Sequence, residues 1–462
     1  MQSHTAIPFR EALRVWIRVA LLSFGGPAGQ IAVMHRILVD EKKWVSEERF
    51  LHALNYCMLL PGPEAMQLAT YIGWLLHRTA GGLAAGCLFV APGFLSILAL
   101  SVVYANYKEA PAVDAVFFGL KAAVVAIVAH AVWRIGRRAL RSGPLVALAA
   151  AAFAAIFLFN VPFPLIILGA IVIGLVGGRI RPDMFRPAPA PDAEGLTPST
   201  ESQPEGSGDA GADGAAAQPS AASAVRRALL TLALWLVIWL TPTLALLAIL
   251  GRGHVFVEEA LFFSKMAVVT FGGAYAVLSY VAQQAVEVYG WLAPLEMLDG
   301  LGMAETTPGP LIQVVQFVGY MGAWRDPGGL HPLAAGALAS VLVTWVTFAP
   351  CFMFIFVGAP WVERLRESRV LASALAGITA AVVGVILNLA VWFALHTIFE
   401  DVDEVRIGPL RLLTPDPASV DLAALALTAG AIVAMFRFKL GMVWTLAACV
   451  AIGIPLRLLT GS

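Results

Sequence analysis

Glycine motifs, three of them with proline, recur at four places inside long apolar stretches. Two are Phe24-Gly25-Gly26-Pro27 and Pro61-Gly62-Pro63, and two are Phe271-Gly272-Gly273 and Pro308-Gly309-Pro310. Proline lacks a backbone N–H and glycine weakens helices, so each motif predicts a helix break with unpaired amides and carbonyls. The helix that resumes presents free N–H groups and a positive dipole end, which suit a phosphate-like or sulfate-like anion. We interpret the motifs as parts of one oxyanion site; the alternative is close helix packing at the glycines and simple kinks at the prolines.

Three basic residues are placed to neutralise a bound anion. Arg18 and Lys265 each stand six residues before a Phe-Gly-Gly motif, and an intramembrane cation costs about 2.5 to 3.5 kcal/mol on insertion scales. Arg18 has the alternative of reaching the cytoplasmic edge of the membrane. Lys121 lies in the apolar stretch 112–133 without an acidic residue three or four positions away. We predict that it is a counter-ion to the substrate, the alternative being a structural pair with Glu64 or another acid.

Carboxyl and amide side chains accompany the proline motifs. Glu64 directly follows Pro63, where it either caps the positive end of the helix or carries a proton beside the anion site. Glu305 stands three residues before Pro308 and has the same two interpretations. Gln67 is placed to donate hydrogen bonds to substrate oxygens or to a neighbouring helix. Glu64 and Glu305 are therefore candidates for proton coupling, and Gln67 is a candidate substrate ligand.

The composition places these motifs in a lipid bilayer. Apolar residues make up 59% of the 462 residues and charged residues 13%, against about 25% in a soluble chain. The formal net charge is zero, which gives no argument for a nucleic-acid partner. The four cysteines lie singly in apolar stretches, without the spacing of a zinc site, and we interpret them as packing residues. Walker, HExxH, GxSxG and dinucleotide motifs are missing, so we expect no enzymatic activity, metal, cofactor or direct ATP coupling.

Apolar stretches of about 20 residues, the length that crosses a bilayer, divide the chain. We predict about 13 transmembrane segments, six before and seven after a polar tract at 182–225. They are 11–35, 50–76, 82–105, 112–133, 143–159, 162–179, 227–250, 258–283, 295–322, 332–358, 370–396, 420–436 and 439–459. The tract 182–225 is rich in Pro, Ala, Gly, Ser, Asp and Glu and cannot bury much apolar surface. It is predicted to be a disordered cytoplasmic linker.

Basic residues set the predicted orientation. Lys and Arg gather at 134–141, at 179–186, and at Arg226 and Arg227, which the positive-inside rule assigns to the cytoplasm. The loop near 160 and the acidic loop 397–417 are poor in basic residues and fit the outer side. We therefore predict a multi-pass membrane protein with a retained, cytoplasmic N-terminus and a periplasmic C-terminus.

The two halves of the sequence are related to each other. The stretch from Arg18 to Gly26 is echoed by the stretch from Lys265 to Gly273, 247 positions later, and the same offset relates the two Pro-Gly-Pro motifs. Because the extra span 227–250 separates the halves, the second should enter the membrane from the opposite side. The predicted fold is an all-α polytopic membrane protein of two inverted-topology repeats with helices broken at the Gly-Gly and Pro-Gly-Pro motifs. The predicted domains are an N-terminal membrane repeat at 1–181, the linker at 182–225, a topology-inverting span at 226–257 and a C-terminal repeat at 258–462.

Two of the predicted spans allow a second topology. Segments 11–35 and 50–76 either cross the membrane fully, or each forms a re-entrant pair of short helices broken at its motif. The loop between them does not decide, because its basic and acidic residues offset each other.

The motifs and their order closely resemble the chromate ion transporter family in its long, two-domain form. The matches run from Ser23 to Met34, Leu60 to Gly73 and Gly86 to Gly93, and more loosely from Thr270 to Gly273, Thr307 to Pro310 and Gln316 to Gly319. The resemblance implies active efflux of chromate across the bacterial inner membrane, driven by the membrane potential or the proton gradient, with chromate resistance as the result. One departure is Ala274, which stands where the first repeat has Pro27, so a softer second break is expected.

Two alternatives stay open. Chromate and sulfate are both tetrahedral dianions, so the chain is alternatively a transporter of sulfate or another oxyanion. A passive anion channel is the other alternative, and uphill accumulation would exclude it. The sequence also leaves open whether the protein forms a homodimer.

Overall fold

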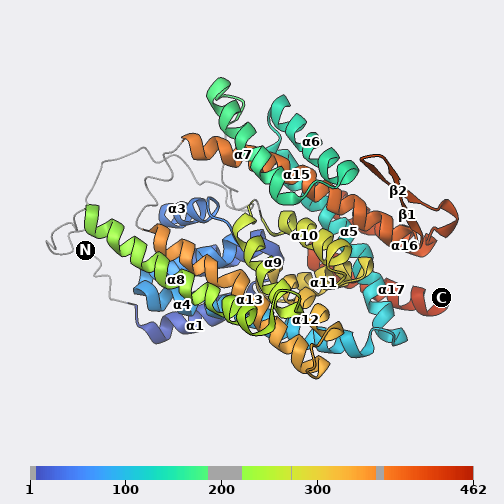
Figure 1. Cartoon of the computed structure of the whole chain (residues 1–462), viewed down its shortest axis with the longest axis horizontal. Coiled ribbons are helices and arrows are strands. Elements are labelled where there is room, and N and C mark those ends of the chain that lie inside the picture. Colours follow the sequence, from blue (N-terminus) through green and yellow to red (C-terminus); the bar gives the residue numbers. More distant parts are fainter. Residues whose placement is uncertain (1–6, 186–220, 272, 360–368, 461–462) are drawn as a thin grey trace.

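The computed structural model of the protein describes residues 7–185, 221–271, 273–359 and 369–460. It is a bundle of α-helices with one small β-hairpin at one end (Figure 1). The first half contains α1 (Phe9–Leu22), α2 (Gly26–His35), the π-helix η1 (Arg36–Glu41), α3 (Glu47–Cys57), α4 (Glu64–Tyr107), α5 (Pro111–Ala139), α6 (Gly143–Phe159) and α7 (Phe163–Ile180).

Helix α8 (Ala221–Leu250) leads into the second half. Its broken helices are α9 (Val255–Val269), α10 (Ala274–Ala282), the π-helix η2 (Gln283–Val288), α11 (Pro294–Thr306), the short 3-10 helix η3 (Leu311–Gln313) and α12 (Val314–Arg325). The rest comprises α13 (Pro332–Gly358), α15 (Arg369–Ile398), β1 (Val402–Ile407), β2 (Leu410–Pro415), the 3-10 helix η5 (Pro417–Ser419), α16 (Leu422–Phe436) and α17 (Met442–Thr460).

The same order of elements opens both halves. A helix, a glycine break and a second helix ending in a π-helix are followed by another helix, a proline break and a further helix. The π-helices Arg36–Glu41 and Gln283–Val288 are separated by the same 247 positions as the motifs. Because π-helices are rare, their recurrence at this offset supports the relation between the halves.

Helices α1 and α2 fold back on each other. Arg18 of α1 pairs with Glu41 at the end of η1, with 2.6 Å between Nη1 and Oε2, and the Lys42 Nζ lies 3.1 Å from the Glu11 Oε1. We call the glycine break, where the chain joins the two helices, the closed end of the pair. The open end is the opposite one, where the start of α1 lies beside the end of η1.

Helix α4 contains a sharp turn at His77 and Arg78, whose φ and ψ angles are not helical. Thr70 lies against Gly86 across this turn. In a straight helix these two residues would be about 24 Å apart, at 1.5 Å per residue. Residues 64–76 therefore fold back along residues 79–107, and the His77 Nε2 comes within 2.8 Å of the Ile7 carbonyl, beside the start of α1.

The second half repeats this folding back. The Lys265 ammonium of α9 lies 5.7 Å from the ring centre of Tyr280 in α10. Arg325, the last residue of α12, pairs with Glu296 in the first turn of α11 at 2.6 Å. Helices α9 with α10, and α11 with α12, are thus two more pairs closed at their breaks. The fourth pair is α3 with residues 64–76 of α4, where the ring centres of Tyr56 and Tyr71 lie 5.2 Å apart.

The described chain has seven helices long and apolar enough to cross a membrane and two shorter apolar ones, α6 and α16. The other four predicted spans, 11–35, 50–76, 258–283 and 295–322, correspond to folded-back pairs of shorter helices. The sequence had left this arrangement open for the first two of them. The physical reason is length: the 14 residues of α1 reach about 21 Å, short of a bilayer core of about 30 Å.

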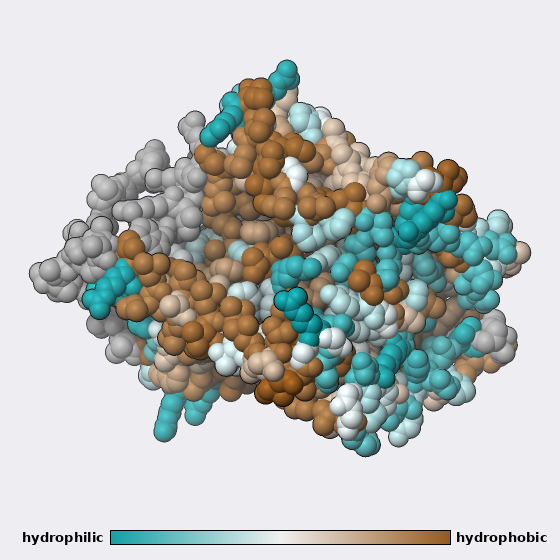
Figure 2. Space-filling model, in the orientation of Figure 1, coloured by the Kyte–Doolittle hydropathy of each residue, from teal (hydrophilic) through white to brown (hydrophobic). Residues whose placement is uncertain are grey.

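On the face shown in Figure 2, apolar side chains cover most of α8 and the elements beside it. Only 11% of an apolar stretch of 18 residues in α8 is buried inside the protein. Soluble proteins rarely expose apolar patches larger than a few hundred Å², so this surface faces lipid. The protein is therefore a multi-pass membrane protein.

The edges of the predicted linker 182–225 are ordered. Phe185 is buried against Gly177, and the Met184 carbonyl accepts a hydrogen bond from the Ser142 hydroxyl at 2.8 Å. Helix α8 begins at Ala221, five residues before the predicted start of its domain. Residues 186–220 lie outside the described chain.

The β-hairpin between α15 and α16 departs from the all-α prediction. Strands β1 and β2 are antiparallel, with Val402 opposite Pro415 and Ile407 opposite Leu410. The hairpin occupies the segment that the sequence places in an acidic outer loop.

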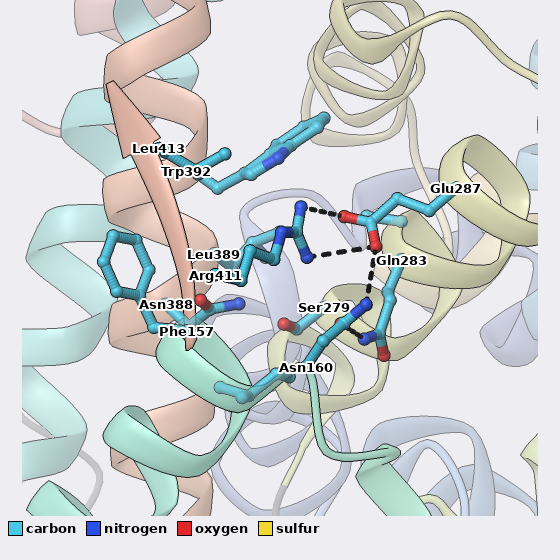
Figure 3. A pocket seen from close by; sticks show the side chains of 12 residues that line it. Phe157, Asn160, Ser279, Gln283, Glu287, Asn388, Leu389, Trp392, Arg411 and Leu413 are labelled. Atoms are coloured by element: carbon cyan, nitrogen blue, oxygen red, sulfur yellow. Dashed lines mark hydrogen bonds and ion pairs between the residues drawn. The ribbon is translucent and has the colours of Figure 1, made fainter. Parts of the chain in front are cut away.

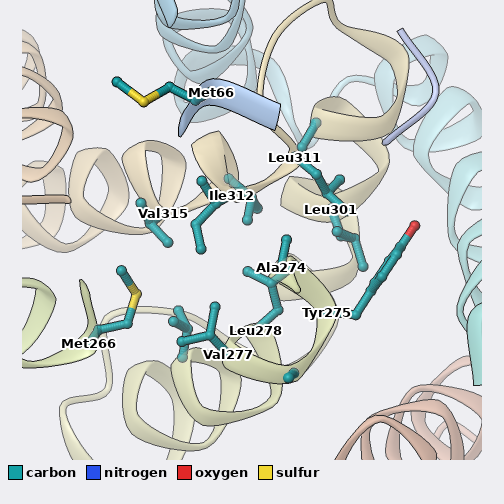
Figure 4. Close-up of a cluster of buried hydrophobic side chains, with 14 of the residues drawn as sticks. Met66, Met266, Ala274, Tyr275, Val277, Leu278, Leu301, Leu311, Ile312 and Val315 are labelled. Carbon is teal, nitrogen blue, oxygen red and sulfur yellow. The ribbon is translucent and has the colours of Figure 1, made fainter. Parts of the chain in front are cut away.

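The best-buried core lies where the folded-back pairs of the two halves meet. Figure 4 shows Met66 of α4 beside side chains of α9, α10, α11, η3 and α12, among them Met266, Leu278, Leu301 and Ile312. All five are buried. This packing holds the four breaks at the centre of the protein.

Candidate functional site

Each folded-back pair closes at one of the four motifs. Gly25, Gly62, Gly273 and Gly309 have φ angles of 88°, 121°, 98° and 106°, in the region that favours glycine. Helix α10 begins at Ala274 after a full break, although no proline follows Gly273. Gly272 of the predicted site lies outside the described residues.

The breaks of one half are hydrogen-bonded to the breaks of the other. The Gly309 N–H donates to the Ser23 carbonyl at 2.9 Å, and the Gly62 N–H donates to the Thr270 carbonyl at 2.8 Å. Gly62 corresponds to Gly309, and Ser23 to Thr270, at the 247-residue offset. The two bonds are therefore equivalent, and each joins a proline motif to the glycine motif of the opposite half.

Close contacts surround both proline motifs. A Cβ atom on Gly309 would lie 3.1 Å from the Gly93 Cα, and one on Gly62 would lie 3.0 Å from the Cys351 Sγ. Gly93 belongs to the second part of α4 and Cys351 to α13. These long helices thus confine the breaks from the side.

Amide side chains complete the backbone pairing. The Gln67 Nε2 donates to the Pro61 carbonyl at 2.7 Å, and the Gln30 Nε2 donates to the Gly309 carbonyl at 2.6 Å. Both side chains are buried. Gln67 therefore already has a backbone partner at the break, and Gln30 is a site residue that the sequence analysis missed.

Four helix N-termini converge at the paired breaks. Helices α2, α4, α10 and the helix that starts with η3 all begin directly after a break, with Pro27, Pro63 and Pro310 beside three of the starts. The first N–H groups of a helix have no partner within it and carry a partial positive charge. The arrangement can bind an oxyanion with backbone amides. The Phe24 side chain, 39% exposed, stands at the first break.

Two carboxyl groups lie beside the breaks of the second half. The Glu64 Oε1 is 3.8 Å from the position of a Cβ on Gly273, so this first-half residue reaches the second-half break. The Glu305 Oε1 accepts a hydrogen bond from the Tyr275 hydroxyl at 2.5 Å, and both residues are buried. The Glu305 Oε2 has no hydrogen-bond partner among the described residues. Tyr275 carried no signal in the sequence.

The three predicted cations are not gathered at the breaks. Arg18 points to the open end of its pair, where it binds Glu41 with 49% of its side chain exposed. Lys265 is exposed beside the rings of Phe262 and Tyr280. Arg18 is thus paired within its own half, and its position relative to the membrane stays a prediction.

Lys121 has an acidic partner in the opposite half. Its Nζ lies 3.8 Å from the Asp299 Oδ1, and the Tyr104 hydroxyl donates to the Asp299 Oδ2 at 2.7 Å. Asp299 is buried in α11, and an acid in that apolar helix was a signal that the sequence analysis missed. This geometry favours the structural pair that the sequence analysis kept as the alternative.

Lys121→Ala is expected to lower the free energy of unfolding by about 3 kcal/mol, because it leaves a buried carboxylate without its cation. Adding Asp299→Asn removes that charge and keeps an acceptor for Tyr104, so the double variant should recover stability and the affinity for the transported anion. Thermal unfolding and the concentration dependence of uptake measure the two effects. A stable double variant with weakened affinity would contradict the structural pair and return Lys121 to the substrate.

Comparison with known proteins identifies the family. The family model described as chromate transporter matches residues 10–175 and 257–454, which together cover most of the chain and both halves. The chain belongs to the chromate transporter family. The resemblance predicted from the motifs is thereby confirmed, and the family is one of transporters.

Three relatives of this chain have names that refer to chromate transport. The chromate transport protein of Pseudomonas aeruginosa is 32% identical over 380 residues, covering 80% of this chain and 77% of the relative. The chromate transport protein of Cupriavidus metallidurans is 25% identical and covers 86% of both chains. A probable chromate transport protein of Synechococcus elongatus is 25% identical over 92% of this chain and 96% of its own. No solved structure matches the chain with statistical significance.

Proposed function

We propose that this protein is a secondary active transporter that exports chromate across the bacterial inner membrane and so confers chromate resistance. The relatives named chromate transport protein support chromate as the substrate. The observation that carries the proposal is the reciprocal pairing of Gly62 with Thr270 and of Gly309 with Ser23. It gathers four helix N-termini inside the bundle, where backbone amides can replace the hydration of a tetrahedral dianion.

The proposed topology is inverted between the halves. The open ends of the first-half pairs lie at the turn of α4, where His77 contacts Ile7. The open ends of the second-half pairs lie at the C-terminal end of α4, where the Lys108 Nζ lies 3.0 Å from the Glu296 Oε1 of α11. Residues 79–107, about 43 Å long at 1.5 Å per residue, separate the two ends. Pairs that enter from opposite membrane faces and meet at the midplane suit alternating access.

On the basis of the basic residues near 137, 179 and 226, we assign the first-half opening and the N-terminus to the cytoplasm and the C-terminus to the periplasm. In this proposal the anion is bound by the amides after Gly25, Gly62, Gly273 and Gly309. Glu64 and Glu305 are the candidates for carrying protons, because both carboxyl groups lie at the breaks.

Uptake of radiolabelled chromate into inverted membrane vesicles tests the proposal. Vesicles with the protein should accumulate chromate several-fold above empty vesicles when a proton gradient or membrane potential is imposed, and an uncoupler should abolish the accumulation. Equilibration without accumulation would instead indicate a passive channel. Unlabelled sulfate as competitor decides the selectivity: inhibition at equal concentration would make the protein a general oxyanion transporter.

A further inference from the structure

A hollow lined by both apolar and polar side chains lies away from the breaks at the hairpin end of the molecule (Figure 3). Residues of α6, α10, η2, α15 and β2 line it, together with Asn160 of the loop between α6 and α7. It extends along α10, whose first residue follows the break at Gly273. The hollow therefore lies between the central breaks and the end of the protein that we assign to the periplasm.

Arg411 of β2 is the only cation among the lining residues in the part of the chain that the structure describes. Its side chain is 10% exposed, and its two Nη atoms lie 3.1 and 2.7 Å from the two oxygens of Glu287 in η2. This two-pronged geometry is the one by which a guanidinium binds carboxylates and phosphates.

The second partner of Arg411 belongs to its own hairpin. The Arg411 Nε lies 3.0 Å from the Glu404 Oε2 of β1. Burial raises the pKa of Glu404, but hydrogen bonds and charges from Arg406 and Arg411 outweigh it and hold that pKa below its ordinary value. Glu404 therefore stays ionised and keeps Arg411 in place whether or not Glu287 is bound.

Glu287 is the partner that can leave. It sits on a different element, and its side chain is 24% exposed, more than that of Arg411. A carboxylate and a tetrahedral oxyanion both offer two oxygens to the same pair of Nη donors, so they compete for one position. The hollow also offers the side-chain amide of Asn388 and the Ser279 hydroxyl, which is buried without a hydrogen-bond partner among the described residues. The Asn160 Nδ2 donates to the Glu287 Oε2 at 3.3 Å, so displacement of the carboxylate would also free this N–H for the anion.

We propose that this hollow is a second oxyanion site, in which a tetrahedral dianion displaces the Glu287 carboxylate from Arg411. The identity of the anion as chromate rests on the proposed function; the site itself rests on Arg411, Glu287 and Ser279. Binding there breaks the contact between Glu287 and Arg411 and so frees η2 and α10 from the hairpin. Helix α10, which follows the break at Gly273, can then move once the anion has passed from the breaks to the hollow.

Equilibrium binding of radiolabelled chromate to the purified full chain in detergent, at low ionic strength, tests this site. Glu287→Gln removes the competing charge and is expected to tighten binding at the second site at least tenfold. Arg411→Gln should abolish that site, and the double variant should show no gain. Arg437→Gln is the matched control, because this exposed arginine at the end of α16 does not line the hollow.

The double variant is also a control for misfolding. Arg411→Gln alone leaves the Glu287 carboxylate without its cation, whereas replacing both residues leaves the net charge of the hollow unchanged. Thermal unfolding of all four variants accompanies the binding curves. A Glu287→Gln curve within twofold of the wild-type curve, or a gain that persists in the double variant, would overturn the second site. Wild-type vesicles that fail to accumulate chromate would overturn the proposed function instead, and the comparison of variants would still decide the hollow.

Discussion

Replacing Gly309 by alanine is expected to abolish chromate accumulation and to destabilise the protein by about 1 to 3 kcal/mol. Gly309 has a φ of 106°, where an L-residue is strained, and its Cβ would lie 3.1 Å from the Gly93 Cα and 3.2 Å from the Gly93 nitrogen. Neither contact is the end of a flexible side chain, so the break itself must move. Movement breaks the bond from the Gly309 N–H to the Ser23 carbonyl and separates the two halves of the site.

Gly430→Ala is the matched control for this prediction. Gly430 lies exposed in α16, and a Cβ there meets no atom within 4 Å. Alanine is also the better helix former, so accumulation and thermal stability should stay at the wild-type level. Uptake into inverted vesicles and thermal unfolding in detergent are the two measurements. Wild-type accumulation by the Gly309 variant would show that the paired breaks are not the transport site.

The breaks could be predicted from sequence because their cause is local. Adjacent glycines, or glycine between two prolines, weaken a helix locally, and the 247-residue offset then links Gly62 with Gly309 without any knowledge of the fold. The folding back of the pairs could not be decided in the same way. It depends on contacts such as that between Arg18 and Glu41, which are 23 positions apart in the sequence.

The partners of charged residues were the least predictable part of the site. Asp299, the partner of Lys121, lies in the other half of the chain, so a search three or four positions away could not find it. Arg18 and Lys265 hold equivalent sequence positions, yet one pairs with a carboxylate and the other lies over aromatic rings. Local pattern predicts the backbone, whereas charge pairing depends on packing between distant elements.

The hairpin was missed for a related reason. Its segment carries enough acidic residues to indicate an outer loop, and the pairing of Val402 with Pro415 appears only when both strands are folded. Arg411, which it places in the hollow, therefore had no signal in the sequence.

Glu305→Gln is expected to lower chromate accumulation driven by a proton gradient at least tenfold, while exchange of labelled for unlabelled chromate stays within twofold of wild type. Glutamine keeps the size of the side chain and an acceptor for the Tyr275 hydroxyl, which binds the Glu305 Oε1 at 2.5 Å. It cannot release a proton, and net movement of protons is needed for accumulation but not for exchange. We expect the Glu305 Oε2, buried without a partner among the described residues, to hold that proton, because an unpartnered charge inside a protein is costly.

Two further variants decide between a proton carrier and a structural acid at this position. Glu48→Gln changes an exposed carboxylate in the first turn of α3 and should leave both accumulation and exchange unchanged. Tyr275→Phe keeps the carboxyl group and removes only its donor, so accumulation should persist with a shifted dependence on pH. Equal loss of accumulation and exchange in Glu305→Gln would mean that the residue supports the site's structure. Full accumulation in that variant would exclude Glu305 as the proton carrier and leave Glu64 as the carboxyl group to test.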